Sequence, residues 1–239
     1  MKKVAVLIYD LFCNFEFSVA LEILAMAGKP ITVFAKDLAP VKSEEGLTLI
    51  AGKSIDELQI EDYDALLLTG SADIRETIID ENILAFIRQF DKPDMIIGAI
   101  SIAPILLLKA GMLKGKRFMA GVNKEELADE GFSHDDLQLM IGWDDNLANP
   151  VSDGFIRDGN IITSISYNFI KWAFAFCKAI GIEASPKAGD TGGRFFCVST
   201  EEPSPCVNLF PLCSLSRINP VQHPRVRNSF PQMIQAADP

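Results

Sequence analysis

Short apolar runs alternate with helical patterns along the first 182 residues, and this alternation constrains the fold more than any other feature. The runs are rich in valine, isoleucine and leucine, and they occupy residues 3–9, 31–35, 65–69 and 95–100. Runs without polar alternation are typical of parallel strands that are covered on both faces. Helical patterns follow three of these runs, at residues 15–27, 79–90 and 103–109. This order predicts an α/β fold with a doubly wound, mostly parallel sheet.

The regular pattern ends near Ile182. A turn at residues 158–160 separates two short predicted strands, and a final helix is expected over residues 166–180. Eight of the 13 prolines lie in residues 183–239, where no period is visible, and each proline removes a backbone donor. We therefore predict one domain over residues 1–182 and a proline-rich, irregular and disordered tail over residues 183–239.

Net charge and hydropathy limit the classes of binding partner and the cellular location that we expect for this chain. The chain carries 22 Lys and Arg against 32 Asp and Glu, a formal charge of -10, which would repel a nucleic-acid backbone. Its longest uncharged apolar stretch, residues 95–108, has 14 residues, whereas a helix that spans a bilayer needs about 20. No secretory signal is recognisable at the N-terminus. We expect a cytoplasmic protein that binds neither nucleic acid nor membranes.

Histidine and paired cysteines are scarce. The chain has two histidines, and its five cysteines include no CxxC pair, so we interpret the cysteines as free thiols. Two histidines are too few for a histidine-rich metal site, and they leave few candidates for the histidine of a Ser-His-Asp triad. We therefore expect no metal and no other cofactor.

The strongest local motif runs from Gly98 to Gly121. A buried strand leads into a turn at Ser101, and Pro104 lies in the first turn of the helix that follows. Such a corner exposes one side chain beside the first helical amides, and the amide of Ile102 could stabilise negative charge there. The corner therefore suits a nucleophile, although a serine that caps the helix would give the same pattern.

Several segments resemble the DJ-1/PfpI superfamily, a class I glutamine amidotransferase-like group with a flavodoxin-like, three-layer sandwich. Residues 98–104 (GAISIAP) are similar to the family's elbow, G-A-I-C-A-A-P. Residues 14–24 (NFEFSVALEIL), 66–70 (LLLTG) and 158–164 (DGNIITS) match in the same order. The resemblance covers residues 3–182 and does not extend to the tail.

The resemblance implies a role for each matched residue. Ser101 falls on the reactive cysteine, Glu16 on the glutamate that contacts it, and Gly70 and Ile102 on the amide donors. Gly121 lies at or near the position where the family often has a histidine. We place Cys13, Ser71 and Gly121 at the rim of the pocket.

Serine in place of cysteine changes the expected chemistry. A helix N-terminus can help a thiol to ionise, whereas a serine hydroxyl needs a general base, and Glu16 is the only obvious candidate. A carboxylate is a poor base unless burial raises its pKa. We therefore expect weak or no catalysis.

The expected function is that of a small-molecule or anion binder of the glyoxalase, deglycase and peptidase-like group that the resemblance implies. If the chain is an enzyme, we expect a hydrolase or a glyoxalase (lyase) type of activity. One alternative is a hydrolase or amidase with Ser101 as nucleophile and Glu16 as acid and base. Another is a chaperone-like, stress-protective protein, and we expect a homodimer in either case.

Overall fold

The computed structural model describes residues 1–186 and 196–200 of the 239. Its centre is a seven-stranded sheet with the strand order β10 (Ile156–Asp158), β11 (Ile161–Ser164), β7 (Ile96–Ile100), β6 (Tyr63–Leu68), β1 (Lys3–Leu7), β2 (Ile31–Ala35) and β5 (Lys53–Ser54). Every neighbouring pair is parallel except β10 and β11. The predicted doubly wound, mostly parallel sheet is therefore confirmed.

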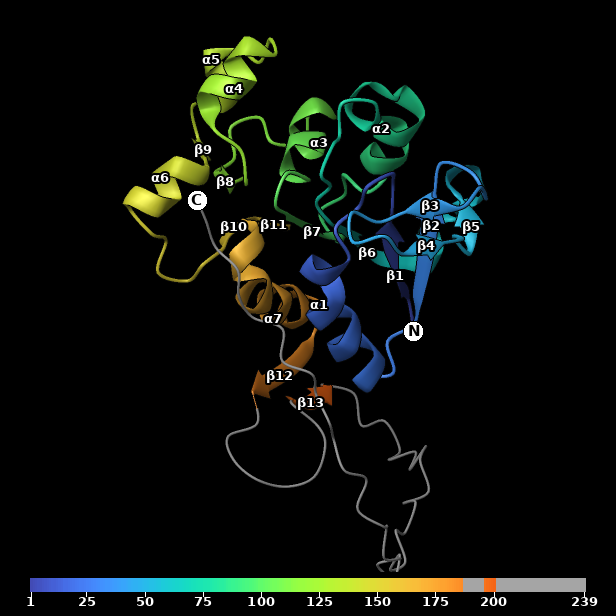
Figure 1. Cartoon of the computed structure of the whole chain (residues 1–239). Helices are drawn as coiled ribbons and strands as arrows, with labels where there is room; N and C mark the ends of the chain where they lie inside the picture. Colours follow the sequence, from blue (N-terminus) through green and yellow to red (C-terminus); the bar gives the residue numbers. More distant parts are fainter. Residues whose placement is uncertain (187–195, 201–239) are drawn as a thin grey trace, which may run out of the picture. The chain divides into compact units, whose positions relative to one another are not determined.

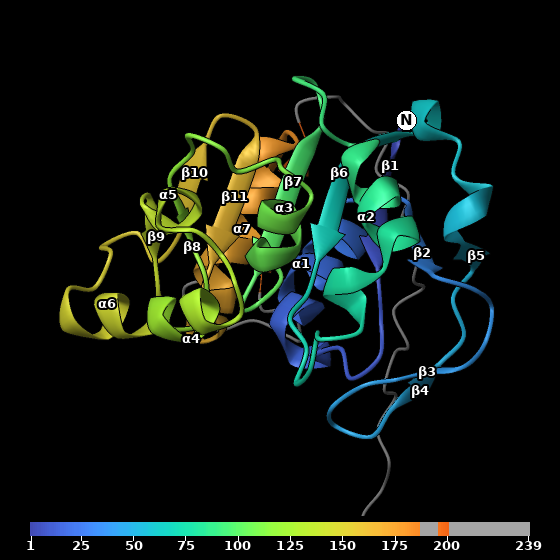
Figure 2. The ribbon, with the colours of Figure 1, turned by 90° about the horizontal axis from the view of Figure 1, so that it is seen from above.

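Helices cover both faces of this sheet (Figures 1 and 2). The two faces are covered by α1 (Asn14–Met26) with α7 (Phe169–Ala179), and by α2 (Glu81–Arg88) with α3 (Pro104–Lys109). Successive strand residues point to opposite faces, so Val4 and Val6 pack on the α1 and α7 side while Ala5 and Leu7 pack on the α2 and α3 side. Burial on both faces is why these strands contain apolar residues without polar alternation.

Helix α7 packs directly on the central part of the sheet. A Cβ atom on Gly98 of β7 would come within 2.6 Å of the Phe176 ring and 3.0 Å of the Trp172 ring. The Trp172 indole also donates a hydrogen bond to the Ile162 carbonyl, at 3.1 Å. Glycine at position 98 therefore allows the α7 aromatic side chains to pack directly on the sheet backbone.

The smaller elements were not apparent from the sequence pattern. They are the hairpin β3 (Val41–Lys42) and β4 (Thr48–Leu49), the parallel pair β8 (Phe118–Met119) and β9 (Met140–Ile141), helices α4 (Lys124–Asp129), α5 (His134–Leu137) and α6 (Trp143–Ala148), and the 3-10 turns η1 (Ile55–Glu57), η2 (Ile60–Asp62), η3 (Thr77–Ile79) and η4 (Ser166–Asn168). Each is too short to show a hydrophobic period. Among the described residues, no helix is long and apolar enough to cross a membrane.

The segment that follows α7 contains regular structure. Strands β12 (Ile182–Pro186) and β13 (Phe196–Thr200) form an antiparallel pair, although we expected an irregular chain from residue 183. The domain boundary expected at residue 182 thus falls at the start of a strand pair. Strands pair through backbone groups, so they can form without a periodic pattern of apolar side chains. Residues 187–195 and 201–239 lie outside the described residues, so the tail's disorder stays a prediction.

Candidate functional site

Ser101 lies in the sharp corner between β7 and α3. Its φ angle is 62°, in the left-handed region that few residues other than glycine adopt. The amide of Ser101 donates to the Ser164 carbonyl at 2.9 Å, and its carbonyl accepts the Gly121 amide at 2.7 Å. Two neighbouring segments therefore hold the backbone in a conformation that costs energy, as is common where a side chain is positioned for function.

Glu16 lies in the first turn of α1 and is almost completely buried, with 2% of its surface exposed. Its Oε2 atom accepts hydrogen bonds from the Gly70 amide at 2.7 Å and from the Thr69 hydroxyl at 3.4 Å. Burial raises the pKa of Glu16, and hydrogen bonds from Ser166, Gly70 and Ser101 oppose this without cancelling it. The carboxyl group therefore keeps its proton to a higher pH than an exposed glutamate does.

Gly70 follows β6, and its backbone lies directly against both side chains. A Cβ atom at this position would come within 2.5 Å of Glu16 Oε2, 2.7 Å of Ser101 Cβ and 2.8 Å of Ser101 Oγ. Gly121 lies on the other side, where a Cβ atom would be 3.3 Å from the Cα and carbonyl carbon of Ser101. The fold thus brings Glu16, Gly70, Ser101 and Gly121 together from distant parts of the chain.

The two predicted amide donors differ in availability. The amide of Gly70 already donates to Glu16. The amide of Ile102, by contrast, has no acceptor among the described residues. In this arrangement Ile102 offers the unengaged donor at the corner, and Gly70 holds the carboxyl group in place.

The match to a family model covers nearly all of the domain that contains this site. The model for the DJ-1/PfpI family matches residues 2–180. The chain belongs to the DJ-1/PfpI family. Solved structures with the same fold carry DJ-1 names as well.

Two characterised relatives are similar over about half of the chain. Isonitrile hydratase from Pseudomonas putida is 30% identical over 128 residues, which are 54% of this chain and 49% of the relative. Protein/nucleic acid deglycase 2 from Escherichia coli is 32% identical over 121 residues, which are 50% of this chain and 70% of the relative. The match thus spans about half the length of the isonitrile hydratase.

Solved structures of the superfamily share the fold. A DJ-1 superfamily protein from Agrobacterium tumefaciens superposes with a TM-score of 0.63 at 19% identity, covering 76% of this chain and 90% of that chain. DJ-1beta from Drosophila melanogaster gives a TM-score of 0.60 at 20% identity, covering 74% and 90%. At these identities the likeness supports the three-layer α/β architecture of this family member and leaves its chemistry to the site itself.

Cys13 lies beside this site, and its thiol is held in the neutral form. It precedes α1, is 3% exposed, and its sulfur lies 3.0 Å from Glu44 Oε1. Burial, the hydrogen bond to Glu44 and the nearby Glu16 together raise the pKa of the Cys13 thiol far above its ordinary value. Cys13 is therefore unsuited to replace the family's reactive cysteine, since the thiolate is the nucleophile.

The start of α1 is capped by a residue from another segment. Glu45, between β3 and β4, accepts hydrogen bonds from the amides of Asn14 and Phe15 at 2.8 and 3.1 Å. Cys13, Glu44 and Glu45 each offer one atom that could bind a metal ion, and these three atoms lie within 4.8 Å of one another. Because Glu45 is engaged with the helix and Cys13 keeps its proton, this cluster serves as a helix cap rather than as a prepared metal site.

Ser71, another predicted rim residue, supports the loop after β6. Its hydroxyl bonds to the carbonyls of Asp10 and Asp73, each at 3.0 Å. Thr69 and Ser166 also contact Glu16. Thr69 stood out in the sequence together with Gly70 and Ser71, because it follows an apolar strand. Ser166 was missed, although it too follows a strand at the carboxyl edge of the sheet, where ligands bind in folds of this kind.

Proposed function

We propose that this DJ-1/PfpI-family chain binds a small molecule with a carbonyl or anionic oxygen at the corner formed by Glu16, Ser101 and Ile102, with weak or no catalysis. One observation supports this most strongly: a buried carboxyl group with a raised pKa contacts Ser101, and the next residue, Ile102, keeps an unengaged amide at the same corner. A protonated carboxyl group and an amide are both donors to oxygen. The relative named as an isonitrile hydratase is consistent with a site for small molecules.

The serine accounts for the weak chemistry in this proposal. An alkanol does not ionise near neutral pH, so Ser101 offers a neutral hydroxyl where a cysteine could offer a thiolate. Glu16 in its protonated form can donate to a ligand oxygen but cannot accept the serine proton. Protonated Glu16 thus favours binding of an anion, and activation of Ser101 would require the ionised form.

Acetate is a suitable probe, titrated into the ¹⁵N-labelled chain while amide shifts are followed by NMR. We expect the amides of Ile102 and Gly70 to shift saturably, with tighter binding at low pH, where Glu16 is protonated. Ser101→Ala should retain binding, while Glu16→Ala should abolish it. Binding that leaves the Ile102 amide unchanged would contradict the proposed site.

A second candidate is a hydrolase with Ser101 as nucleophile, favoured by the hydrogen bond between Ser101 and a carboxyl group whose pKa is raised. A fluorophosphonate probe tests it. The Ser101 oxygen would bond to phosphorus, fluoride would leave, and ionised Glu16 would take the hydroxyl proton. Mass spectrometry should then find one adduct per chain, absent from Ser101→Ala, with a rate that rises as Glu16 ionises. An unlabelled chain at every pH from 5 to about 9 would remove this candidate.

The homodimer and the cytoplasmic location stay predictions. Sedimentation equilibrium measures the first and fractionation of cells measures the second. A monomer at concentrations well above those in the cell would contradict the dimer.

A further inference from the structure

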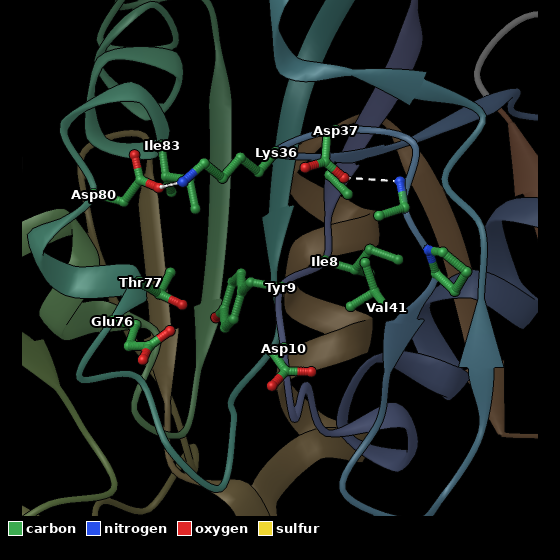
Figure 3. Close-up of a pocket in the computed structure, with 13 residues that line it drawn as sticks. Ile8, Tyr9, Asp10, Lys36, Asp37, Val41, Glu76, Thr77, Asp80 and Ile83 are labelled. Carbon is green, nitrogen blue, oxygen red and sulfur yellow. Dashed lines mark hydrogen bonds and ion pairs between the residues drawn. The ribbon is translucent and has the colours of Figure 1, made fainter.

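A separate cleft opens beside the carboxyl ends of β1 and β2 (Figure 3). It has a volume of about 330 Å³ and is formed by the segments after β1 and β2, by η3 and by the start of α2. Neither Glu16 nor Ser101 lines it. Carboxyl ends of strands are where open α/β sheets bind ligands, so the position is suitable for a second site.

The charges that line this cleft are mostly negative. Four carboxylates, Asp10, Asp37, Glu76 and Asp80, face one lysine, Lys36. Lys36 is committed to Asp80, with Nζ and Oδ2 2.6 Å apart. Among the described residues, the other three carboxylates form no ion pair. A cleft with this surplus attracts cations.

Thr77 supplies an independent indication of a ligand. It is 7% exposed, and its hydroxyl has no hydrogen-bond partner in the part of the chain that the structure describes. Figure 3 shows this hydroxyl directed towards the Tyr9 ring, with the carboxylates of Glu76 and Asp10 at the same end of the cleft. Thr77 is not among the residues whose fully buried polar atom lacks a partner, so its unengaged oxygen is open to the cleft. A hydroxyl held in this way by an otherwise buried side chain can accept a hydrogen bond from a ligand.

Apolar groups form the remaining wall. The ring of Tyr9 and the side chains of Ile8, Val41 and Ile83 line the cleft. The Tyr9 hydroxyl donates to the Thr69 carbonyl, so its polar end is satisfied outside the cleft. The ring can therefore contact a cation or an alkyl chain.

We propose that this cleft binds a small organic cation, namely an ammonium group on a short apolar chain. The ammonium group donates to the carboxylates of Glu76 and Asp10 and to the Thr77 hydroxyl. The chain packs on Tyr9, Ile8 and Val41. A hard divalent cation fits less well, because calcium takes six to eight oxygen ligands and half of this wall is apolar.

The site does not depend on the function proposed for Glu16 and Ser101. Its test uses the full chain and butylammonium as the probe, with NMR titration and calorimetry as the measurements. 1-Butanol has the same chain without the charge, butyrate reverses the charge, and calcium ions test the inorganic alternative. We expect saturable binding of butylammonium, shifts at Asp10, Glu76 and Thr77, and binding at least about tenfold weaker for 1-butanol.

Three variants locate the ligand. Glu76→Gln and Asp10→Asn each remove one carboxylate from the exposed part of the cleft, and Thr77→Val removes the Thr77 hydroxyl at nearly constant volume. We expect each carboxylate variant to weaken butylammonium binding by about tenfold. Asp153→Asn makes the same chemical change at an exposed residue outside the cleft, and it should leave the affinity unchanged.

Several results would overturn the proposal. One is equal affinity for 1-butanol and butylammonium, which would show that charge plays no part. Another is an Asp10→Asn effect no larger than that of Asp153→Asn. Displacement of butylammonium by submillimolar calcium would assign the carboxylates to a metal instead. If Thr77→Val does not fold, the two carboxylate variants still decide the question, because their side chains lie at the surface.

Discussion

Gly70→Ala tests the close contact on which the candidate site depends. The added methyl group would lie 2.5 Å from Glu16 Oε2 and 2.7 Å from Ser101 Cβ, both shorter than normal van der Waals contact. Overpacking of this kind costs about 1–3 kcal/mol, and disturbing the hydrogen bond from the Gly70 amide to Glu16 adds about 1 kcal/mol. Replacing a glycine whose φ is not positive also stabilises the protein by about 0.4–1 kcal/mol, because alanine lowers the conformational entropy of the unfolded chain. We expect a net loss of about 2–3 kcal/mol.

Urea unfolding monitored by circular dichroism measures this loss directly. Gly52→Ala is the matched control, because a Cβ atom at residue 52 would meet only the Val33 carbonyl oxygen, at the ordinary distance of 3.7 Å. That variant should lie within about 1 kcal/mol of the parent protein. A domain of this size should lose about 4–12 °C in melting temperature with Gly70→Ala.

A double-mutant cycle identifies the cause. Ser101→Gly removes the Cβ and Oγ atoms that the new methyl group would meet, so its combination with Gly70→Ala should recover part of the loss. We expect a coupling free energy of about 1 kcal/mol. If Gly70→Ala costs no more than Gly52→Ala, or if the two changes are strictly additive, the backbone of residue 70 does not lie against Ser101, and the site geometry is wrong.

Three further predictions concern ionisation and strain. Burial raises the pKa of Glu16, so the stability that this group contributes is fully present below the ordinary value of 4.5 and is lost as the pH rises through the raised value. The unfolding free energy of Glu16→Gln should therefore increase relative to that of the parent protein as the pH rises. A difference between the two that is constant from pH 4 to about 8 would refute this. Ser101→Gly should stabilise the fold by about 1 kcal/mol in urea unfolding, because glycine adopts the 62° φ angle without strain; a loss of stability would show that contacts of the serine side chain outweigh that strain. Ser101→Cys should give a thiol that iodoacetamide modifies faster than Cys13, whose pKa is raised by burial and by the hydrogen bond to Glu44; equal rates, read by mass spectrometry, would mean that the corner does not stabilise a thiolate.

The main strands and helices could be located from the sequence. The expected strand at residues 31–35 coincides with β2, and the helix expected at 103–109 is α3 within one residue. These elements could be predicted because burial on both faces of a sheet, or on one face of a helix, selects apolar residues at a fixed spacing. The stretch between β8 and α6 contains only short elements with no such spacing, so its structure could not be derived in the same way.

The candidate site shows where sequence reasoning ends. The order of strands and turns was enough to nominate Glu16, Gly70 and Ser101, since residues that follow parallel strands collect at one edge of the sheet. Sequence alone did not reveal that the Gly70 amide is engaged by Glu16, across 54 positions of the chain. Nor did it reveal that Glu45 caps α1 from a distant hairpin.

The amino-acid sequence by itself determined the layered α/β fold and the residue types at the corner, because both follow from local patterns of apolar side chains and turns. Only the tertiary structure decided the protonation tendency of Glu16, the neutral state of Cys13 and the acidic cleft around Thr77. The physical reason is that a pKa and the shape of a cleft depend on burial and on neighbours brought from other segments. No spacing along a single chain encodes those distances.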